Sequence, residues 1–437
     1  MITNFFDLAT NSLREKALKI INAGYEAINI SKVTKERIFL EGNKLKILDK
    51  EYNLKDYKRI YLTAFGKGSS DFAFSVAKIL GGHLTGGIVL DVRKPNISVW
   101  ETIPEELNFY EGTHPLPSLK NVEAVKKIVK MLNGLRRDDL VLTLITGGGS
   151  SLLCGSEEEL QESIMVTKML TKSGAPINEL NTVRKHLSEV KGGKLAEIVY
   201  PAKMISIIAC DVCAGKETMD LSMVASGPTI KDKTSIEDAK EIILKYGLNP
   251  LNFNLRETPK DEMIFERTEN ILFVSNEDAL MGMVKKSLKL RLKPKIFSLN
   301  IEGEAKDSLK EMIDSVNPGE VLIAGGETTV TINGEGGKGG RNQEVVLGAL
   351  KYLEENKDFD DSLLVSSIAS DGRDNGEAGG AIGDLKILQK GEVANLNFKK
   401  YLKDHDEFNF FKETGGLVYA EPNSFNVADF MLVLKSE

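Results

Sequence analysis

Three glycines followed by two hydroxyl residues form the most suggestive group in the sequence: Gly147, Gly148, Gly149, Ser150 and Ser151. Glycine lets the backbone adopt left-handed conformations and approach a ligand closely. Backbone N–H groups in such a loop can bind an anion, and a helix that begins at the serines would add the attraction of its dipole. A plain tight turn would also fit, but three successive glycines carry an entropic cost that a turn alone does not require. We therefore predict that this loop binds phosphate.

Lys67 stands between Gly66 and Gly68 at the end of another apolar run. The segment is not a Walker A loop, because Tyr61 occupies the position where that pattern requires its first glycine. A lysine placed here can hold a phosphate or a carboxylate as a point charge. The alternative is an ordinary surface lysine in contact with solvent. Because glycines flank Lys67 on both sides, both interpretations stay open.

Acidic residues follow three further apolar runs: Asp211, Glu327 and Asp371. A carboxylate at such a place can bind Mg2+, accept the proton of a hydroxyl group, or cap the next turn. For Asp211 and Asp371 these three possibilities stay open on the residues alone. Arg341 lies further along the chain, after a loop rich in glycine.

That loop matches the dinucleotide-binding pattern at Gly334, Gly336 and Gly339. A match inside a segment made mostly of glycine is close to chance, so it gives little support for a dinucleotide site. We favour a flexible lid that places Lys338 and Arg341 over an anion.

The elements that must position these residues alternate along the chain. Short apolar runs, each followed by a polar or glycine-rich turn, occupy residues 60–65, 140–145, 204–209, 271–274, 321–324 and 363–368. Such runs predict parallel strands buried on both faces, and hence an α/β fold. Functional groups in these folds collect at the carboxyl ends of the strands, where the residues above are placed. The polar stretch 249–270 contains Pro250 and Pro259 and predicts the boundary of two domains, 1–260 and 261–437.

Composition narrows the class of protein. The 437 residues include 57 Lys and Arg against 64 Asp and Glu, a net charge of -7, which gives no support for a nucleic-acid or membrane partner. Cys154, Cys210 and Cys213 are too few for a disulfide framework, and the C-x-x-C pair lacks the second pair that a zinc site would need. No apolar run approaches the roughly 18 residues of a membrane span. We expect a cytoplasmic protein that acts on small molecules, with its oligomeric state open.

Several longer strings, taken together, resemble the glycerate 2-kinases, also called class II glycerate kinases or the MOFRL family. They occur in the family's order from about residue 60 to the C-terminus. The strings are residues 114–117 (HPLP), 181–193 (NTVRKHLSEVKGG), 225–229 (ASGPT), 325–330 (GGETTV), 339–344 (GGRNQE) and 370–372 (SDG) with Asp374 and Gly376.

The resemblance implies an enzyme that uses ATP and Mg2+ to phosphorylate the 2-hydroxyl of D-glycerate. It implies a Rossmann-like N-terminal domain, a second α/β domain of MOFRL type, and an active site in the cleft between them. The family's active-site lysine falls on Lys67 and its arginine on Arg341, while its strand-end acids fall on Asp211, Glu327 and Asp371.

On this basis we expect catalysis by Lys67, Arg341 and Asp211. Gly147, Gly148, Gly149, Ser150 and Ser151 would bind the ATP phosphates. Glycerate would contact Lys67, Arg341, Glu327 and Asn426. The metal would be held by Asp211 and Asp371.

Two segments depart from the family pattern. Residues 212–220 are longer than usual and carry Lys216 and Glu217 where the family has an acid pair, and residues 421–429 gain Phe425 in a small polar turn that keeps Asn426. The first departure concerns whether this segment binds the metal, and the second concerns which residues contact the substrate. A hydroxypyruvate reductase and a non-catalytic sugar- or nucleotide-binding regulator remain as alternative functions.

Overall fold

The computed structural model describes residues 1–93, 104–210, 219–332, 334–356, 360–421 and 426–437. Contacts within the chain define two units. The N-terminal unit contains residues 30–210 and 220–274, and the C-terminal unit contains residues 1–29 and 275–437. None of the described helices combines the length and apolar character needed to cross a bilayer.

The N-terminal unit is built on a six-stranded sheet with the order β6-β5-β4-β7-β8-β9, in which all neighbouring strands are parallel. Its strands are β4 (Arg59–Phe65), β5 (Gly86–Asp91), β6 (Leu107–Glu111), β7 (Asp139–Ile145), β8 (Lys203–Ala209) and β9 (Thr268–Val274). Every residue of β7 is buried, as expected for a central parallel strand. The Rossmann-like arrangement and the predicted strands at 60–65, 140–145, 204–209 and 271–274 are confirmed.

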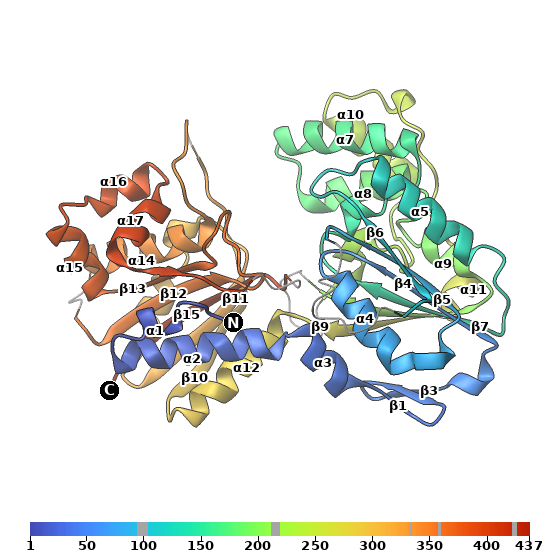
Figure 1. The fold of residues 1–437 in the computed structure, drawn as a ribbon. Coiled ribbons are helices and arrows are strands. Elements are labelled where there is room, and N and C mark those ends of the chain that lie inside the picture. Colours follow the sequence, from blue (N-terminus) through green and yellow to red (C-terminus); the bar gives the residue numbers. More distant parts are fainter. Residues whose placement is uncertain (94–103, 211–218, 333, 357–359, 422–425) are drawn as a thin grey trace. The chain divides into compact units, whose positions relative to one another are not determined.

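Helices cover this sheet (Figure 1). Helix α4 packs on β4 and β5, whereas α5 contacts β5 and β6 and α9 contacts β8. The helices are α3 (Ile30–Arg37), α4 (Ser69–Leu80), α5 (Leu119–Leu132), α6 (Gly149–Leu152), α7 (Glu157–Lys172), α8 (Ile177–Leu187), α9 (Lys194–Val199), α10 (Ile236–Lys245) and α11 (Glu262–Glu266). A three-stranded antiparallel sheet adds β1 (Ile38–Glu41), β2 (Lys44–Ile47) and β3 (Lys50–Asn53). Capping boxes at Ser118 and Ser235 start α5 and α10, as their sequences indicate.

The C-terminal unit has a mixed sheet with the order β10-β11-β15-β12-β13-β14. Its strands are β10 (Lys293–Ile301), β11 (Glu320–Gly326), β12 (Leu363–Ala369), β13 (Gly380–Asp384), β14 (Leu417–Val418) and β15 (Asp429–Lys435). Only β10 and β11 are parallel, while β15 runs antiparallel to both β11 and β12. The prediction that the run 363–368 forms a parallel strand was therefore wrong. The run is apolar because β12 is buried throughout, and burial on both faces does not fix strand direction.

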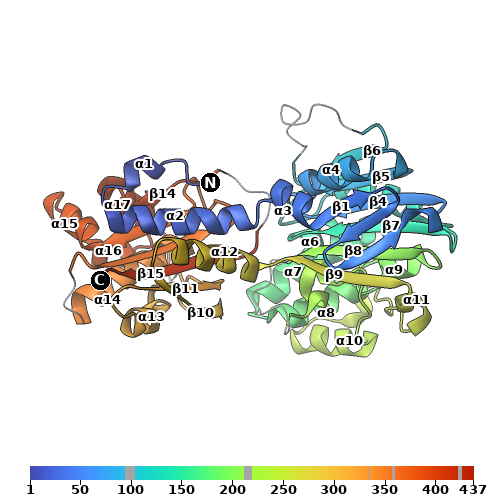
Figure 2. The ribbon, with the colours of Figure 1, turned by 90° about the horizontal axis from the view of Figure 1, so that it is seen from below.

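Helices α2 (Ser12–Ala27) and α12 (Asn276–Lys289) pack side by side on one face of this sheet (Figure 2). Helix α14 (Arg341–Asn356) contacts β12 and β13 and packs in the same buried cluster as residues of α17. The remaining helices are α1 (Phe5–Leu8), α13 (Lys310–Ser315), α15 (Leu385–Val393), α16 (Phe398–Lys403) and α17 (Glu407–Thr414).

The contacts divide the chain differently from the expected ranges 1–260 and 261–437. Strand β9 completes the sheet of the N-terminal unit. Helix α2 belongs to the C-terminal unit, where the buried Arg14 guanidinium donates to both carboxylate oxygens of Asp384 at 2.6 and 2.7 Å. A buried charge pair of this kind cannot be separated without leaving an unpaired buried ion, so the first 29 residues are fastened to the C-terminal sheet.

Candidate active site

The loops after β4 and β7 lie at the switch point of the N-terminal sheet. From β4 the chain adds β5 and β6 on one side, and from β7 it adds β8 and β9 on the other. Consecutive connections therefore diverge at these two neighbouring strands, which leaves a crevice at their carboxyl ends where ligands of such folds bind. The loop after β4 carries Lys67 and the loop after β7 carries Gly147, Gly148 and Gly149.

The two loops touch through glycine. The backbone N–H of Lys67 donates to the carbonyl of Gly147 at 2.8 Å. Gly148 has a φ of 79°, and a Cβ atom there would lie 3.1 Å from the His114 ring and 3.3 Å from Cγ of Lys67. A side chain at this position would therefore be strained and would crowd both neighbours. The glycine keeps Lys67, His114 and the loop backbone close together.

The glycine loop presents donors as the sequence predicts. Within the described chain, the backbone N–H groups of Gly147, Gly148 and Gly149 have no hydrogen-bond acceptor, which suits them to an anion. Helix α6 has only four residues, so the expected contribution of a helix dipole is small. The Ser150 hydroxyl pairs with that of Ser226 at 2.9 Å, and the Ser151 hydroxyl donates to the Gly148 carbonyl at 3.1 Å. Both predicted serine contacts are thus occupied by the protein itself.

Lys67 brings a positive charge that no described acidic residue pairs with. Its side chain is half-buried, and it forms no ion pair with any residue that the structure describes. Beside it, partial burial of the His114 ring and then the charge of Lys67 lower the pKa of this histidine, although the residue as a whole is exposed. The histidine is therefore neutral at pH 7, and the charge of this site is that of the lysine.

Asp91, at the end of β5, closes the N-terminus of α4. Its two carboxylate oxygens accept hydrogen bonds from the backbone N–H groups of Gly68 at 3.2 Å and Ser70 at 2.9 Å. In dinucleotide-binding folds, the start of this first helix holds a pyrophosphate, and an acidic side chain after the second strand holds a ribose. Here the acid itself fills the helix terminus, so neither position is available in its usual role.

A strained segment next to the glycine loop was missed as a site. Ala225, Ser226 and Gly227 follow one another with φ values of 52°, 57° and 57°, a costly conformation for the two residues that are not glycine. A Cβ atom on Gly149 would lie 2.6 Å from Cβ of Ala225, and the Ser226 hydroxyl donates to Oδ1 of Asn181 at 3.2 Å. The strings 181–193 and 225–229 contained these residues, but nothing in their spacing indicated that they pack on the loop.

The C-terminal unit gathers a second set of polar residues. Asp429 begins β15 and is paired with Gly326 at the end of β11 and with Ala369 at the end of β12. Because β15 is antiparallel to both neighbours, its first residue lies beside their last residues. The residues that follow β11 and β12, Glu327 and Asp371, therefore lie at the same sheet edge as Asp429.

Arg341 begins α14 and is held by two of these acids. Its Nε and Nη2 donate to the two carboxylate oxygens of Asp429 at 2.6 and 3.2 Å, and its Nη1 donates to Glu327 at 2.6 Å. The Nε and Nη2 edge of the guanidinium, which could otherwise bind a substrate carboxylate through two hydrogen bonds, is thus occupied by buried Asp429. The Nη1 side is more accessible, because the Glu327 side chain is 54% exposed. Asp429 was not predicted, although an acid at the start of a long apolar run was visible in the sequence.

Asn426 and Asp371 lie at this edge as well. The Ser370 hydroxyl donates to Oδ1 of Asn426 at 3.2 Å, and the backbone N–H of Arg373 donates to Oδ1 of Asp371 at 3.0 Å. With a single hydrogen bond from the described residues and a partly exposed carboxylate, Asp371 suits an oxygen-coordinating cation such as Mg2+. Asp211, the other predicted ligand, lies outside the described residues.

The glycine-rich loop before α14 does not serve as a dinucleotide fingerprint. It is separated from the end of β11 at Gly326 by further residues, whereas the fingerprint must follow its strand directly. Nor is it a free lid, since the backbone of residues 337–338 exchanges hydrogen bonds with residues 404–408. The Lys338 ammonium lies 3.7 Å from the ring centre of Phe408 and 3.6 Å from Oε1 of Glu377.

Two family models and several known proteins match this chain. The family described as Domain of unknown function (DUF4147) matches residues 16–258, and the MOFRL family matches residues 320–429. A glycerate 2-kinase of Pyrococcus horikoshii is 31% identical over 97% of both chains. The crystal structure of a glycerate kinase from Thermotoga maritima has a TM-score of 0.82 and 29% identity, covering 97% of this chain and 99% of that one.

One further relative bears a different name. A protein of Agrobacterium vitis, named provisionally as a hydroxypyruvate reductase, is 34% identical over 75% of this chain and 77% of its own. The matches with the kinases extend over nearly the full length of both proteins and over both units of the fold. By its sequence and by its fold, this chain belongs to the glycerate 2-kinase family.

Proposed function

We propose that this protein transfers the γ-phosphoryl group of ATP to the 2-hydroxyl of D-glycerate, giving 2-phosphoglycerate and ADP. One observation carries the proposal. The Lys67 ammonium, which forms no ion pair with a described residue, lies beside a glycine loop whose N–H groups have no acceptor among those residues. That combination suits the polyphosphate of a nucleotide. Relatives named glycerate 2-kinase and glycerate kinase support the acceptor. We place the reaction in the cytoplasm, in keeping with the low cysteine content.

Phosphoryl transfer depends mainly on positioning and charge neutralisation. The N–H groups of Gly147, Gly148 and Gly149 would bind the phosphate oxygens, and Lys67 would neutralise the group in transfer. The glycerate O2 forms the new bond to phosphorus as the bond from phosphorus to the ADP oxygen breaks. The hydroxyl proton would pass to an acidic side chain, for which Asp211 is the candidate.

Mg2+, when bound, neutralises the phosphate charge. Asp371 would hold it together with Asp211, since a partly exposed carboxylate at a strand end is a ligand of the type that this ion requires. The hydrogen bond from the backbone N–H of Arg373 occupies only Oδ1 of the Asp371 carboxylate.

Glycerate must be bound through its carboxylate, and Arg341 would do so through Nη1. Asp429 keeps the other edge of the guanidinium in place, so the arginine is oriented before substrate arrives. Glu327 occupies Nη1 at 2.6 Å but is largely exposed. The substrate carboxylate would displace it, with Asn426 as a further contact.

A reductase is the second candidate, because one relative carries that name. Against it stands Asp91, which fills the helix terminus and the acidic position that a nicotinamide dinucleotide would use. We therefore expect no oxidation of NADH by this protein with hydroxypyruvate.

One assay separates these functions. Purified protein is given ATP, Mg2+ and D-glycerate; ADP release is followed by a coupled reaction, and the product is then offered to enolase. We expect ADP release that depends on D-glycerate and a product that enolase consumes directly. ADP release with a product that enolase rejects would overturn the 2-position. Loss of NADH absorbance with hydroxypyruvate, without ADP release, would favour the reductase.

A further inference from the structure

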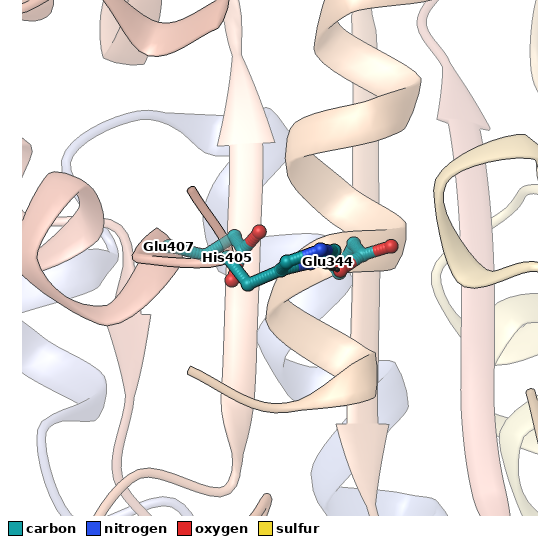
Figure 3. A group of neighbouring side chains, drawn as sticks. All are labelled: Glu344, His405 and Glu407. Carbon is teal, nitrogen blue, oxygen red and sulfur yellow. Dashed lines mark hydrogen bonds and ion pairs between the residues drawn. The ribbon is translucent and has the colours of Figure 1, made fainter. Parts of the chain in front are cut away.

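Three side chains of the C-terminal unit meet where α14 contacts α17. Glu344 lies on α14, His405 precedes α17, and Glu407 is the first residue of α17. Figure 3 shows the three side chains next to one another. Nδ1 of His405 lies 2.9 Å from Oε2 of Glu344, and one possible ligand atom from each residue falls within 4.8 Å of the other two.

Two of these side chains are buried with unused acceptors. Glu344 and Glu407 are each 1% exposed, and Oε1 of each has no hydrogen-bond partner among the described residues. An unpaired carboxylate oxygen in the interior is costly. Gly339 covers Glu407 so closely that a Cβ atom there would lie 2.4 Å from Oε2 of the glutamate. Water therefore has little room to donate hydrogen bonds to these carboxylate oxygens.

The surroundings add negative charge. Asp374 and Asp406 act electrostatically on Glu407, and Glu304 acts on Glu344. Lys306 is the basic side chain that acts on Glu344. Asp374 is already bound to the backbone N–H groups of Asn342 and Gln343. Carboxyl groups outnumber basic side chains around this cluster, which favours a bound cation.

We propose that Glu344, His405 and Glu407 bind a divalent transition-metal ion, with Zn2+ as the probe. Imidazole together with carboxylates is a donor set for zinc and related ions, whereas Mg2+ prefers oxygen ligands alone. Ligand atoms on one zinc ion lie at most about 4 Å apart, so small rotations of the glutamates would complete the site. The hydrogen bond between His405 and Glu344 would be replaced by two bonds to the metal.

The site would connect α14 to the start of α17. Residues 404–408 also hold the glycine-rich loop through hydrogen bonds with residues 337–338. Glu344 follows Arg341 by one helical turn on α14. An ion here would therefore stabilise the element that carries Arg341, and its role is structural and separate from that of Mg2+.

The test uses the full chain, freed of metal by chelation and then dialysed against limiting Zn2+ without nucleotide or glycerate. Bound metal is measured by elemental analysis, and the thermal midpoint is measured with and without Zn2+. We expect one equivalent of bound Zn2+ and a raised midpoint. Glu344→Gln and Glu407→Gln should each weaken Zn2+ binding by at least about 100-fold. The control is Glu413→Gln, which replaces an exposed glutamate on α17 and should bind Zn2+ as the unchanged protein does.

Each buried glutamine variant loses a buried acid, so we expect it to fold, and circular dichroism checks this. Co2+ bound to the unchanged protein supplies a second readout, because tetrahedral coordination gives visible absorption bands that vanish on adding Zn2+. No bound equivalent in the unchanged protein, or equal binding in all variants, would overturn the proposal. Either result would leave the proposed kinase activity untouched, since no substrate is present.

Discussion

Lys67 and Arg341 are the two cations that the sequence predicted to be catalytic, and their surroundings differ. Lys67 has no opposite charge among the described residues. Arg341 donates three hydrogen bonds to two carboxylates, one of them on the buried Asp429. A cation without a partner leaves its charge available to a ligand, whereas a paired cation is part of the fold.

The difference teaches that one type of charge can serve in two ways. The charge of Lys67 would interact with the ligand and not with the rest of the protein. Replacing Lys67 should therefore lower activity without lowering stability. Arg341 also compensates a buried carboxylate, so that its loss should affect both activity and stability. Substitutions at the two positions test this distinction.

Arg341→Ala should have the largest effect. Removing the guanidinium leaves Asp429 buried without its partner, which costs about 3–5 kcal/mol in the free energy of unfolding. We also expect kcat/KM for glycerate to fall by about 100-fold or more. Urea denaturation measures the first effect and the coupled ADP assay the second.

The double variant Arg341→Ala with Asp429→Asn serves as the control. Asparagine at position 429 carries no charge that would be buried without a partner. The double variant should therefore regain part of the free energy of unfolding without regaining activity. If Arg341→Ala alone were as stable as the unchanged protein, the structural part assigned to this arginine would be refuted.

Lys67→Ala should lower kcat/KM by about 100-fold or more and leave the fold intact. Because the ammonium forms no ion pair with a described residue, the free energy of unfolding should change by no more than about 0.5 kcal/mol. Lys78→Ala, at an exposed position on α4, should change neither quantity. A large loss of stability in Lys67→Ala would contradict the contrast with Arg341.

Gly148→Ala should give an intermediate effect on nucleotide binding. Its φ of 79° is unfavourable for alanine, and the new Cβ would press on His114 and Lys67. We expect the KM for ATP to rise by about tenfold, from strain and displacement of order 1–2 kcal/mol. Gly134→Ala is a matched control, since its φ is 73° but nothing lies within 4 Å of the added Cβ. An equal rise in KM in both variants would show that backbone strain alone explains it.

Sequence patterns predicted much of the N-terminal unit and less of the C-terminal unit. The runs that became β4, β7, β8 and β9 were apolar and were followed by glycine or polar residues. Strand β5 was missed because Gly86 and Gly87 begin it. Packing requires a glycine at position 87, because a Cβ atom there would lie 2.4 Å from the Leu107 side chain. This is a contact between strands that no local pattern contains.

The site was predicted in its individual residues but not in their partners. Lys67 and the glycine loop followed from strand ends and glycine chemistry. The bond from Arg341 to Asp429 joins residues 88 positions apart in sequence, and it depends on β15 entering the sheet antiparallel. Strand order and direction are set by the whole fold, so a pairing that depends on them cannot be derived from a single segment.

His114 provides the smallest predicted effect and bears on the charge next to Lys67. Partial burial and the nearby ammonium lower its pKa, so the ring takes up its proton only at a pH below its usual range near 6.5. Between pH 8 and 6 its charge should therefore not change, and kcat/KM should show no inflection from this group. The pH profile of His114→Gln should run parallel to that of the unchanged protein. A step near pH 6.5 that disappears in His114→Gln would mean that the ring is protonated there, and that Lys67 is not the only positive charge beside the glycine loop.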